Sequence, residues 1–156
     1  MINAFANLSV FTGRQRARIL RRAGVHSGAG VEIEPGFRIA GDHDLWLGDG
    51  CFINHDVYID CVAEVRFGAN SGMAQGARII TSHHDIRNPD DERLESPTEP
   101  RAVTIGSQVW IGAGSTVLPG VTIANRCVIA ANSLIGKDTE PGGVYLGVPA
   151  RRIREI

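Results

Sequence analysis

Two adjacent histidines, His83 and His84, stand at the start of a segment that cannot belong to a regular core. The segment, about residues 82–101, contains three prolines and six acidic residues, and proline removes a hydrogen-bond donor that an interior strand needs. We therefore expect a projecting loop, and loops of this length are usually functional or disordered. A neutral imidazole can take a proton near neutral pH, so either histidine could serve as a general base. Taken alone, a surface histidine satisfied by local hydrogen bonds would be the better interpretation, so the surrounding pattern must decide.

Other groups that could carry chemistry give weaker signals. The three cysteines, Cys51, Cys61 and Cys127, are odd in number and show no CxxC or other metal spacing. Core packing explains Cys51 and Cys127 best, and free cysteines favour a reducing, cytoplasmic compartment. A net charge of −1 and a pI near 6.5 leave no general basic surface for nucleic acid. No apolar run approaches the roughly 18 residues of a membrane span.

The elements that must position these groups are indicated by aliphatic residues that recur every six positions. Helix faces repeat near 3.6 residues and strand faces at two, whereas a period of six is typical of the flat faces of a β-solenoid. Three such faces close a triangular coil of about 18 residues. A β-sandwich is disfavoured because its strands recur every 8 to 12 residues. The repeated positions are Leu47, Ile53, Ile59, Phe67, Met73, Ile79, Ile105, Ile111, Val117, Ile123, Ile129 and Ile135, with a two-residue slip before Phe67.

This pattern predicts one all-β domain over residues 29–156, preceded by an N-terminal arm, residues 1–28. Five arginines between positions 14 and 22 predict a short basic helix in the arm. It could contact an anionic membrane or an acidic glycan; alternatively, it is a solvated helix that packs Ile19 and Leu20 on the end of the solenoid. The tail, residues 138–156, should fold back over the last coil, because Tyr145, Leu146 and Val148 need burial.

The C-terminal half of the solenoid resembles the hexapeptide-repeat acyltransferases. The motifs that carry the resemblance are Val103-Thr104-Ile105-Gly106, Val109-Trp110-Ile111-Gly112, Leu118-Pro119-Gly120-Val121-Thr122-Ile123 and Gly147-Val148-Pro149-Ala150 with basic residues after it. Within the family, the chain is most similar to the galactoside, maltose and polysaccharide O-acetyltransferases, over about residues 30–156. The resemblance implies a left-handed parallel β-helix, a homotrimer with active sites at subunit interfaces, acetyl-CoA as donor, and a sugar or glycan hydroxyl as acceptor. It implies no metal.

The same resemblance implies roles for individual residues. In the family, a histidine in a Thr-x-x-His motif at the base of the extended loop is the general base, and Thr81-Ser82-His83-His84 places His84 in that position. His83 would need a one-residue shift and is expected beside the acceptor. His84 would deprotonate the acceptor hydroxyl for direct attack on the thioester, and backbone N–H groups would stabilise the oxyanion. Asn54 matches the family position that contacts sugar hydroxyls, and Asp60, one hexad further on, is expected to reach the same cleft.

For coenzyme A, the resemblance points to backbone contacts at Ala113 and Ala131. It also points to four residues near the phosphates, in keeping with the preference of phosphate for Lys and Arg. Family members often carry Thr where this chain has Gly136, which removes one hydroxyl contact. Trp110 either lines the donor groove or covers the outer face of the solenoid. The four phosphate candidates are Gly136, Lys137, Arg151 and Arg154.

Other functions fit the same fold. Serine, antibiotic and amino-sugar N-acetyltransferases remain alternatives within the family, although the long helical N-terminal domain of serine acetyltransferases is absent. A γ-type carbonic anhydrase needs three zinc-binding histidines, two of them about five residues apart. Here positions 88 and 89 are Asn88 and Pro89. A non-catalytic scaffold with an ice-binding face would show a long rank of outward threonines, which Thr104, Thr116 and Thr122 do not form.

Overall fold

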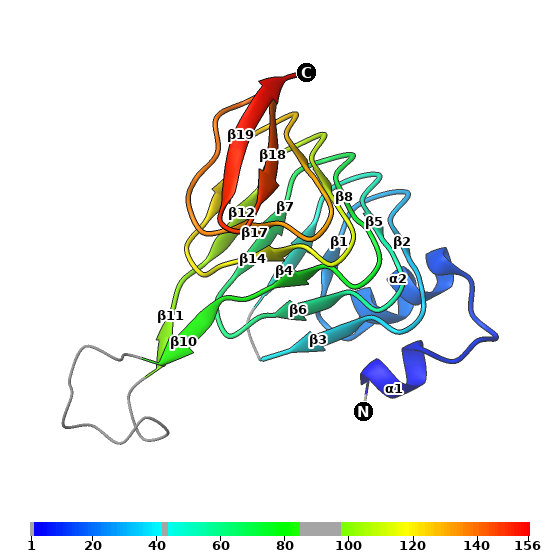
Figure 1. Ribbon diagram of the computed structural model, residues 1–156. Helices are drawn as coiled ribbons and strands as arrows, with labels where there is room; N and C mark the ends of the chain where they lie inside the picture. The colour runs from blue at the N-terminus through cyan, green and yellow to red at the C-terminus, as the bar shows by residue number, and fades with distance from the viewer. Residues whose placement is uncertain (1, 42–43, 85–97) are drawn as a thin grey trace.

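The computed structural model describes residues 2–41, 44–84 and 98–156. Two helices, α1 (Ile2–Ala6) and α2 (Gly13–Arg22), precede a coil of short strands that forms three parallel sheets (Figure 1). Sheet A contains β1 (His26–Ser27), β4 (Leu45–Leu47), β7 (Val65–Phe67), β12 (Val103–Ile105) and β15 (Thr122–Ile123). Sheet B contains β2 (Glu32–Ile33), β5 (Phe52–Ile53), β8 (Gly72–Met73), β13 (Trp110–Ile111), β16 (Val128–Ile129) and β18 (Gly143–Gly147), with β19 (Ala150–Glu155) antiparallel at its end. Sheet C contains β3 (Arg38–Ala40), β6 (Tyr58–Asp60), β9 (Arg78–Ile79), β14 (Thr116–Val117) and β17 (Leu134–Ile135).

The six-residue repeat builds the core, as predicted. All twelve repeated positions are buried, with no more than 4% of any residue exposed. They align from coil to coil: Ile53 pairs with Met73, Met73 with Ile111, and Ile111 with Ile129. The three cysteines are free and buried in the same core, which confirms the packing interpretation. The predicted β-solenoid is therefore confirmed.

Nine of the twelve repeated aliphatic residues are followed three positions later by a corner residue with left-handed backbone geometry. Glycine holds several of these positions, as at Gly114 (φ +66°), because it adopts positive φ at no steric cost. Elsewhere L-residues do so, namely Asp56, Asn70, Gln108, Arg126 and Asn132. The small, polar corner residues seen in the sequence follow from this requirement.

The corner between sheets C and A, called the CA corner here, absorbs the irregularities of the repeat. Between Ile59 and Phe67, the two-residue slip adds a longer turn after β6. One coil further on, the chain leaves this corner as an antiparallel hairpin of β10 (Ser82–His84) and β11 (Thr98–Pro100). Figure 1 shows this hairpin projecting from the edge of the prism. These strands are the described ends of the predicted loop, and residues 85–97 lie outside the described residues.

The N-terminal arm closes the first coil. The amides of Asn3 and Asn7 donate to the carbonyl oxygens of Ile39 (2.7 Å) and Phe37 (2.8 Å), so α1 covers the open edge of sheet C. From α2, buried Arg16 donates to the carbonyl of Ile33 at the edge of sheet B (3.3 Å). Such covers prevent edge-to-edge pairing of strands. The first strand, β1, begins at His26, before the boundary at residue 28 expected from the repeat.

The tail covers the last coil only in part. Tyr145 is buried and its hydroxyl accepts from the Glu140 backbone N–H (2.7 Å). The expectation that Leu146 and Val148 are also buried is wrong, since they are 47% and 70% exposed. Leu146 lies on β18 and Val148 in the turn between β18 and β19, and both side chains lie outside the narrow core. This end of the molecule therefore carries exposed apolar surface.

Candidate functional site

The root of the projecting hairpin is fixed to the solenoid through Thr81, which is fully buried. Its hydroxyl donates to the carbonyl of Asp60 (2.9 Å) and accepts from the backbone N–H of Ala63 (3.0 Å). Its carbonyl accepts from the backbone N–H of Arg101, where the hairpin returns (2.7 Å). Both ends of the hairpin are thus joined to one buried threonine. The sequence pattern included Thr81 only as a motif residue and gave no sign of this role.

The Asp60 carboxylate also accepts hydrogen bonds from the root of the hairpin. Its Oδ2 accepts from the backbone N–H of Thr81 (3.1 Å) and from the hydroxyl of Ser82 (2.9 Å). Only 6% of Asp60 is exposed. The residue expected to contact sugar hydroxyls is therefore engaged in hydrogen bonds to the hairpin. A positioning role fits this geometry better than direct acceptor binding.

The two histidines lie on β10, close to the point where it leaves the solenoid. Side chains of successive strand residues point to opposite faces, so His83 and His84 cannot share one environment. His83 faces Glu99 on β11, with 3.6 Å between Nε2 and Oε2, and Glu99 also binds Arg101 (3.0 Å). His84 is exposed on the other face, opposite Thr98. The hairpin therefore holds His83 beside the Glu99–Arg101 ion pair and presents His84 on its other face.

A second group of predicted residues lies along the BC corner, the corner between sheets B and C. Asn54 follows β5 at this corner and accepts from the backbone N–H of His55 through Oδ1 (2.7 Å). Ala113 and Ala131 follow β13 and β16, and the Ala113 carbonyl accepts from Asn132 (2.8 Å). Within the described ranges, the backbone N–H groups of Ala113 and Ala131 have no hydrogen-bond acceptor. These two donors are available to a ligand lying along the corner.

Trp110 is the first residue of β13, on the outer face of sheet B, and is 41% exposed. Its ring lies over Gly72, since a Cβ on Gly72 would come within 3.0 Å of the Trp110 Cζ3 atom. The missing side chain of Gly72 lets the indole rest flat on the sheet. This position agrees with both interpretations of Trp110, a groove wall and a cover for the sheet.

A cationic pocket of about 470 Å³ lies at the C-terminal end of the coil. It brings together Gly136, Lys137 and Arg151 from the predicted phosphate group, and it adds Arg152, which the sequence did not single out. Arg152 is paired with Glu140 (3.1 Å). Among the described residues, Lys137 and Arg151 have no carboxylate partner. Arg154, further along β19 opposite Val144, does not line the pocket.

The predicted residues therefore fall into two groups on opposite edges of sheet C. Asp60, the histidine hairpin and Lys137 lie at the CA corner, whereas Asn54, Ala113 and Ala131 lie at the BC corner. In Figure 1, the hairpin leaves one edge of this sheet, and the turns between β5 and β6 lie at the other. One chain does not bring the histidines next to the BC-corner donors.

Two further findings concern the described part of the chain. None of its helices is long and apolar enough to cross a membrane. No group of three or more His, Cys, Asp or Glu side chains in the described ranges could hold a metal ion.

Comparisons with known proteins agree with this architecture. The family pattern described as "Bacterial transferase hexapeptide (six repeats)" matches residues 102–137. The galactoside O-acetyltransferase of Escherichia coli (strain K12) is 30% identical over 142 residues, covering 91% of this chain and 69% of that protein. YJL218W of Saccharomyces cerevisiae is 36% identical over 124 residues, covering 80% of this chain and 62% of its own length. The chain thus spans less than two thirds of that relative.

A solved structure of galactoside acetyltransferase in complex with coenzyme A superposes with a TM-score of 0.81 and 26% identity, over 99% of this chain and 76% of that one. The chain belongs to the hexapeptide-repeat family of acyltransferases, and its solenoid is the left-handed parallel β-helix of that family.

Proposed function

We propose that the protein is an acetyl-CoA-dependent O-acetyltransferase whose acceptor is a sugar or glycan hydroxyl and whose general base is His84. The observation that carries the proposal is the hairpin root, where a buried Thr81–Asp60 network fixes the strand that presents His84. The named activity of the Escherichia coli relative and the coenzyme A bound by the superposed galactoside acetyltransferase support it.

The proposed reaction needs no nucleophile from the enzyme. A neutral His84 imidazole takes the proton of the acceptor hydroxyl while the hydroxyl oxygen bonds to the thioester carbonyl carbon. The tetrahedral oxyanion then collapses, the C–S bond breaks, and the CoA sulfur leaves with the proton that the imidazolium returns. Backbone N–H donors are suited to stabilise the oxyanion.

The donor site is proposed along the free backbone N–H groups of Ala113 and Ala131, which can bind the amide carbonyls of a pantetheine arm. Lys137 and Arg151 in the C-terminal pocket suit the phosphates, because neither cation is already neutralised by a carboxylate within the described residues. Arg154 and Trp110 complete the proposed donor site, although neither lines that pocket.

The separation of the two groups on sheet C supports a homotrimer with shared sites. If His84 of one subunit faces the BC corner of the next, the base, Asn54 and the donor amides meet in a cleft between subunits. The exposed Leu146 and Val148 supply apolar surface for such contacts. The free, buried cysteines support a reducing, cytoplasmic location.

The test is acetyl transfer by purified wild type, His84→Ala and His83→Ala. Consumption of acetyl-CoA is measured against simple sugars, amino sugars, serine and streptogramin-like hydroxyls. We expect activity on a sugar hydroxyl, and a loss of about 10² to 10⁴ in kcat for His84→Ala with the fold and coenzyme A affinity kept. His83→Ala should lose much less. Full activity of His84→Ala would refute the assignment of the base, and transfer only to amines or serine would refute the acceptor class.

A further inference from the structure

The N-terminal cap, residues 2–24, has a charge opposite to that of the rest of the protein. Residues 1–31 contain five arginines and no acidic residue, a charge of +5. Because the whole chain carries −1, the remaining 125 residues carry −6. A molecule with this asymmetry is oriented by a negatively charged surface, with the cap toward it.

The arginines of α2 are divided between structure and solvent. The helix buries Arg16, Ala17 and Leu20 against the first coil. Arg14, Arg18 and Arg22 follow at four-residue spacing on the opposite, exposed side. Arg14 is partly neutralised by Glu32 (2.8 Å), whereas Arg18, Arg21 and Arg22 have no acidic partner within the described ranges.

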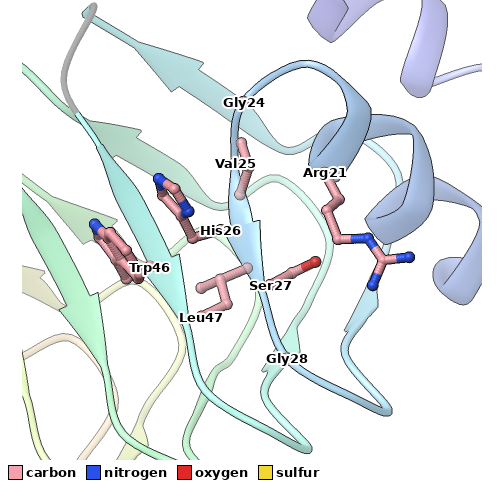
Figure 2. Close-up of a pocket in the computed structure, with 8 residues that line it drawn as sticks. All are labelled: Arg21, Gly24, Val25, His26, Ser27, Gly28, Trp46 and Leu47. Atoms are coloured by element: carbon pink, nitrogen blue, oxygen red, sulfur yellow. The ribbon is translucent and has the colours of Figure 1, made fainter.

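Arg21 lies in a pocket of about 440 Å³ between the end of α2 and sheet A. Figure 2 shows Arg21 extending from α2 on one side of strand β1, while the parallel rings of His26 and Trp46 lie on its other side. Together with Arg14 and Arg18, Arg21 also lines a shallow depression of about 220 Å³ floored by the turn at Ser27 and Gly28. The hollows at this end of the prism are therefore lined by two arginines, Arg18 and Arg21, that have no acidic partner within the described ranges.

Exposed apolar side chains lie in the same N-terminal cap, on α1 and in the segment between α1 and α2. Phe5, Leu8 and Val10 are 53%, 49% and 75% exposed. They are held by an ordered turn, because the backbone N–H of Leu8 donates to Phe5 (3.2 Å) and that of Phe11 donates to Leu8 (3.2 Å). The Phe5 and Phe11 rings pack against each other with centroids 5.4 Å apart. A short segment that combines exposed large apolar groups with an arginine-rich helix is typical of segments that lie in a membrane interface.

We propose that the N-terminal cap docks the protein on an anionic lipid bilayer, with Phe5, Leu8 and Val10 entering the headgroup region and Arg18, Arg21 and Arg22 contacting lipid phosphates. Charge complementarity selects this occupant, since two copies of the cap would repel each other through the same arginines. The cap covers the end of the coil, not its flat sides, so lateral assembly would leave it free and would place several caps in one plane. Docking would keep a membrane-linked acceptor close to the histidine hairpin, but it does not depend on the acetyl-transfer proposal.

The experiment is cosedimentation of the full chain with vesicles of phosphatidylcholine alone or with about one-third phosphatidylglycerol, at low and high salt. Wild type should bind only the anionic vesicles and should be released by salt. Arg18→Gln should weaken binding about fivefold, and Arg18→Gln/Arg22→Gln about 25-fold. Arg126→Gln is the matched control, because this exposed arginine lies between β15 and β16 at the far end of the coil. Leu8→Ser/Val10→Ser should weaken binding about tenfold while the salt dependence remains.

Several results would overturn the proposal. They are an absence of wild-type binding to anionic vesicles at low salt, or equal losses for Arg18→Gln and Arg126→Gln. Binding to an acidic polysaccharide but not to vesicles would assign the cap to a glycan. A lower sedimentation mass of Leu8→Ser/Val10→Ser would assign the apolar turn to contacts between copies of the chain.

Discussion

Asp60 is a buried carboxylate at the root of the histidine hairpin. It accepts hydrogen bonds from Thr81 and Ser82, the two residues immediately before the histidine pair. Losing such an acceptor leaves buried donors unsatisfied, which costs about 1–3 kcal/mol. The consequence for catalysis is a shift of β10, and with it of His84. Asp60 is therefore proposed as a positioning residue.

We predict that Asp60→Ala lowers kcat at least about tenfold, because small displacements of a catalytic group are costly. Asp60→Asn should recover most of the loss, since its amide oxygen can still accept from Thr81. The acceptor KM should change little in both variants. Steady-state kinetics with thermal unfolding as a control measures this. If KM rises while kcat is kept, Asp60 contacts the sugar, as the sequence first suggested.

The neighbouring Cys61 thiol makes stability dependent on pH. Burial, together with the adjacent Asp60 charge, raises the pKa of Cys61 to about 12. The unfolded chain releases this proton near pH 9 and the folded chain does not, so the free energy of unfolding falls as pH rises from about 9 to 12. The slope for this group is about 1.4 kcal/mol per pH unit. Urea unfolding at several pH values should show a shallower decline for Cys61→Val, and an unchanged slope would contradict the prediction.

At the candidate site, the sequence predicts features that lie within a short motif, but it does not reveal contacts between residues on different coils. The Thr-x-x-His spacing predicts His84 as the base because that motif lies within four residues, and the assignment stays a prediction. The hydrogen bonds from Thr81 and Ser82 to Asp60 span 21 and 22 residues, and they exist only because one coil lies directly above another. The position of Arg152 in the cationic pocket was also missed, because it depends on the pairing of β19 with β18.

At the scale of elements, the close approach of successive coils limits which residues the corners tolerate. A Cβ on Gly68 would lie 2.5 Å from the backbone nitrogen of Ser107 in the next coil. A Cβ on Gly76 would meet nothing within 4 Å, although its backbone φ is +65°. Gly68 is required because a side chain has no space there, whereas Gly76 is favoured because its backbone φ is positive.

We therefore predict that Gly68→Ala destabilises the protein more than Gly76→Ala. Forcing a methyl group against backbone costs about 1–3 kcal/mol or more, whereas an alanine with positive φ costs about 1 kcal/mol. Urea denaturation midpoints of the two variants measure the difference. The reverse order, or equal losses, would show that the coils can separate at this corner without penalty.

The repeat predicted the sheets and their core because each hexad carries its own signal. The arm behaves differently, since it covers sheet C through Asn3 and Asn7, whose partners lie 36 and 30 residues away. The exposure of Leu146 and Val148 was missed for a related reason: the narrow core had no room left for them. Segments that pack on the ends of the solenoid in this way carry no six-residue repeat, so the sequence pattern does not reveal their contacts.

At the scale of the whole molecule, the position of the two groups on opposite edges of sheet C makes a strict prediction about assembly. If each site combines His84 of one subunit with the BC corner of the next, two differently inactivated chains can complement each other. His84→Ala removes the base, and Ala131→Glu places a carboxylate beside the anionic donor at an exposed corner. Each variant alone should be inactive.

Refolding an equal mixture of the two variants should restore about a quarter of wild-type activity, because in a random cyclic trimer one neighbour pair in four contributes both intact halves. Sites built within one chain would give none. The matched control mixes wild type with the double variant His84→Ala/Ala131→Glu, for which shared sites retain about a quarter of the activity and unshared sites about half. Activity per subunit, read together with the trimer mass from sedimentation, decides between a cleft shared by neighbouring prisms and a self-contained one.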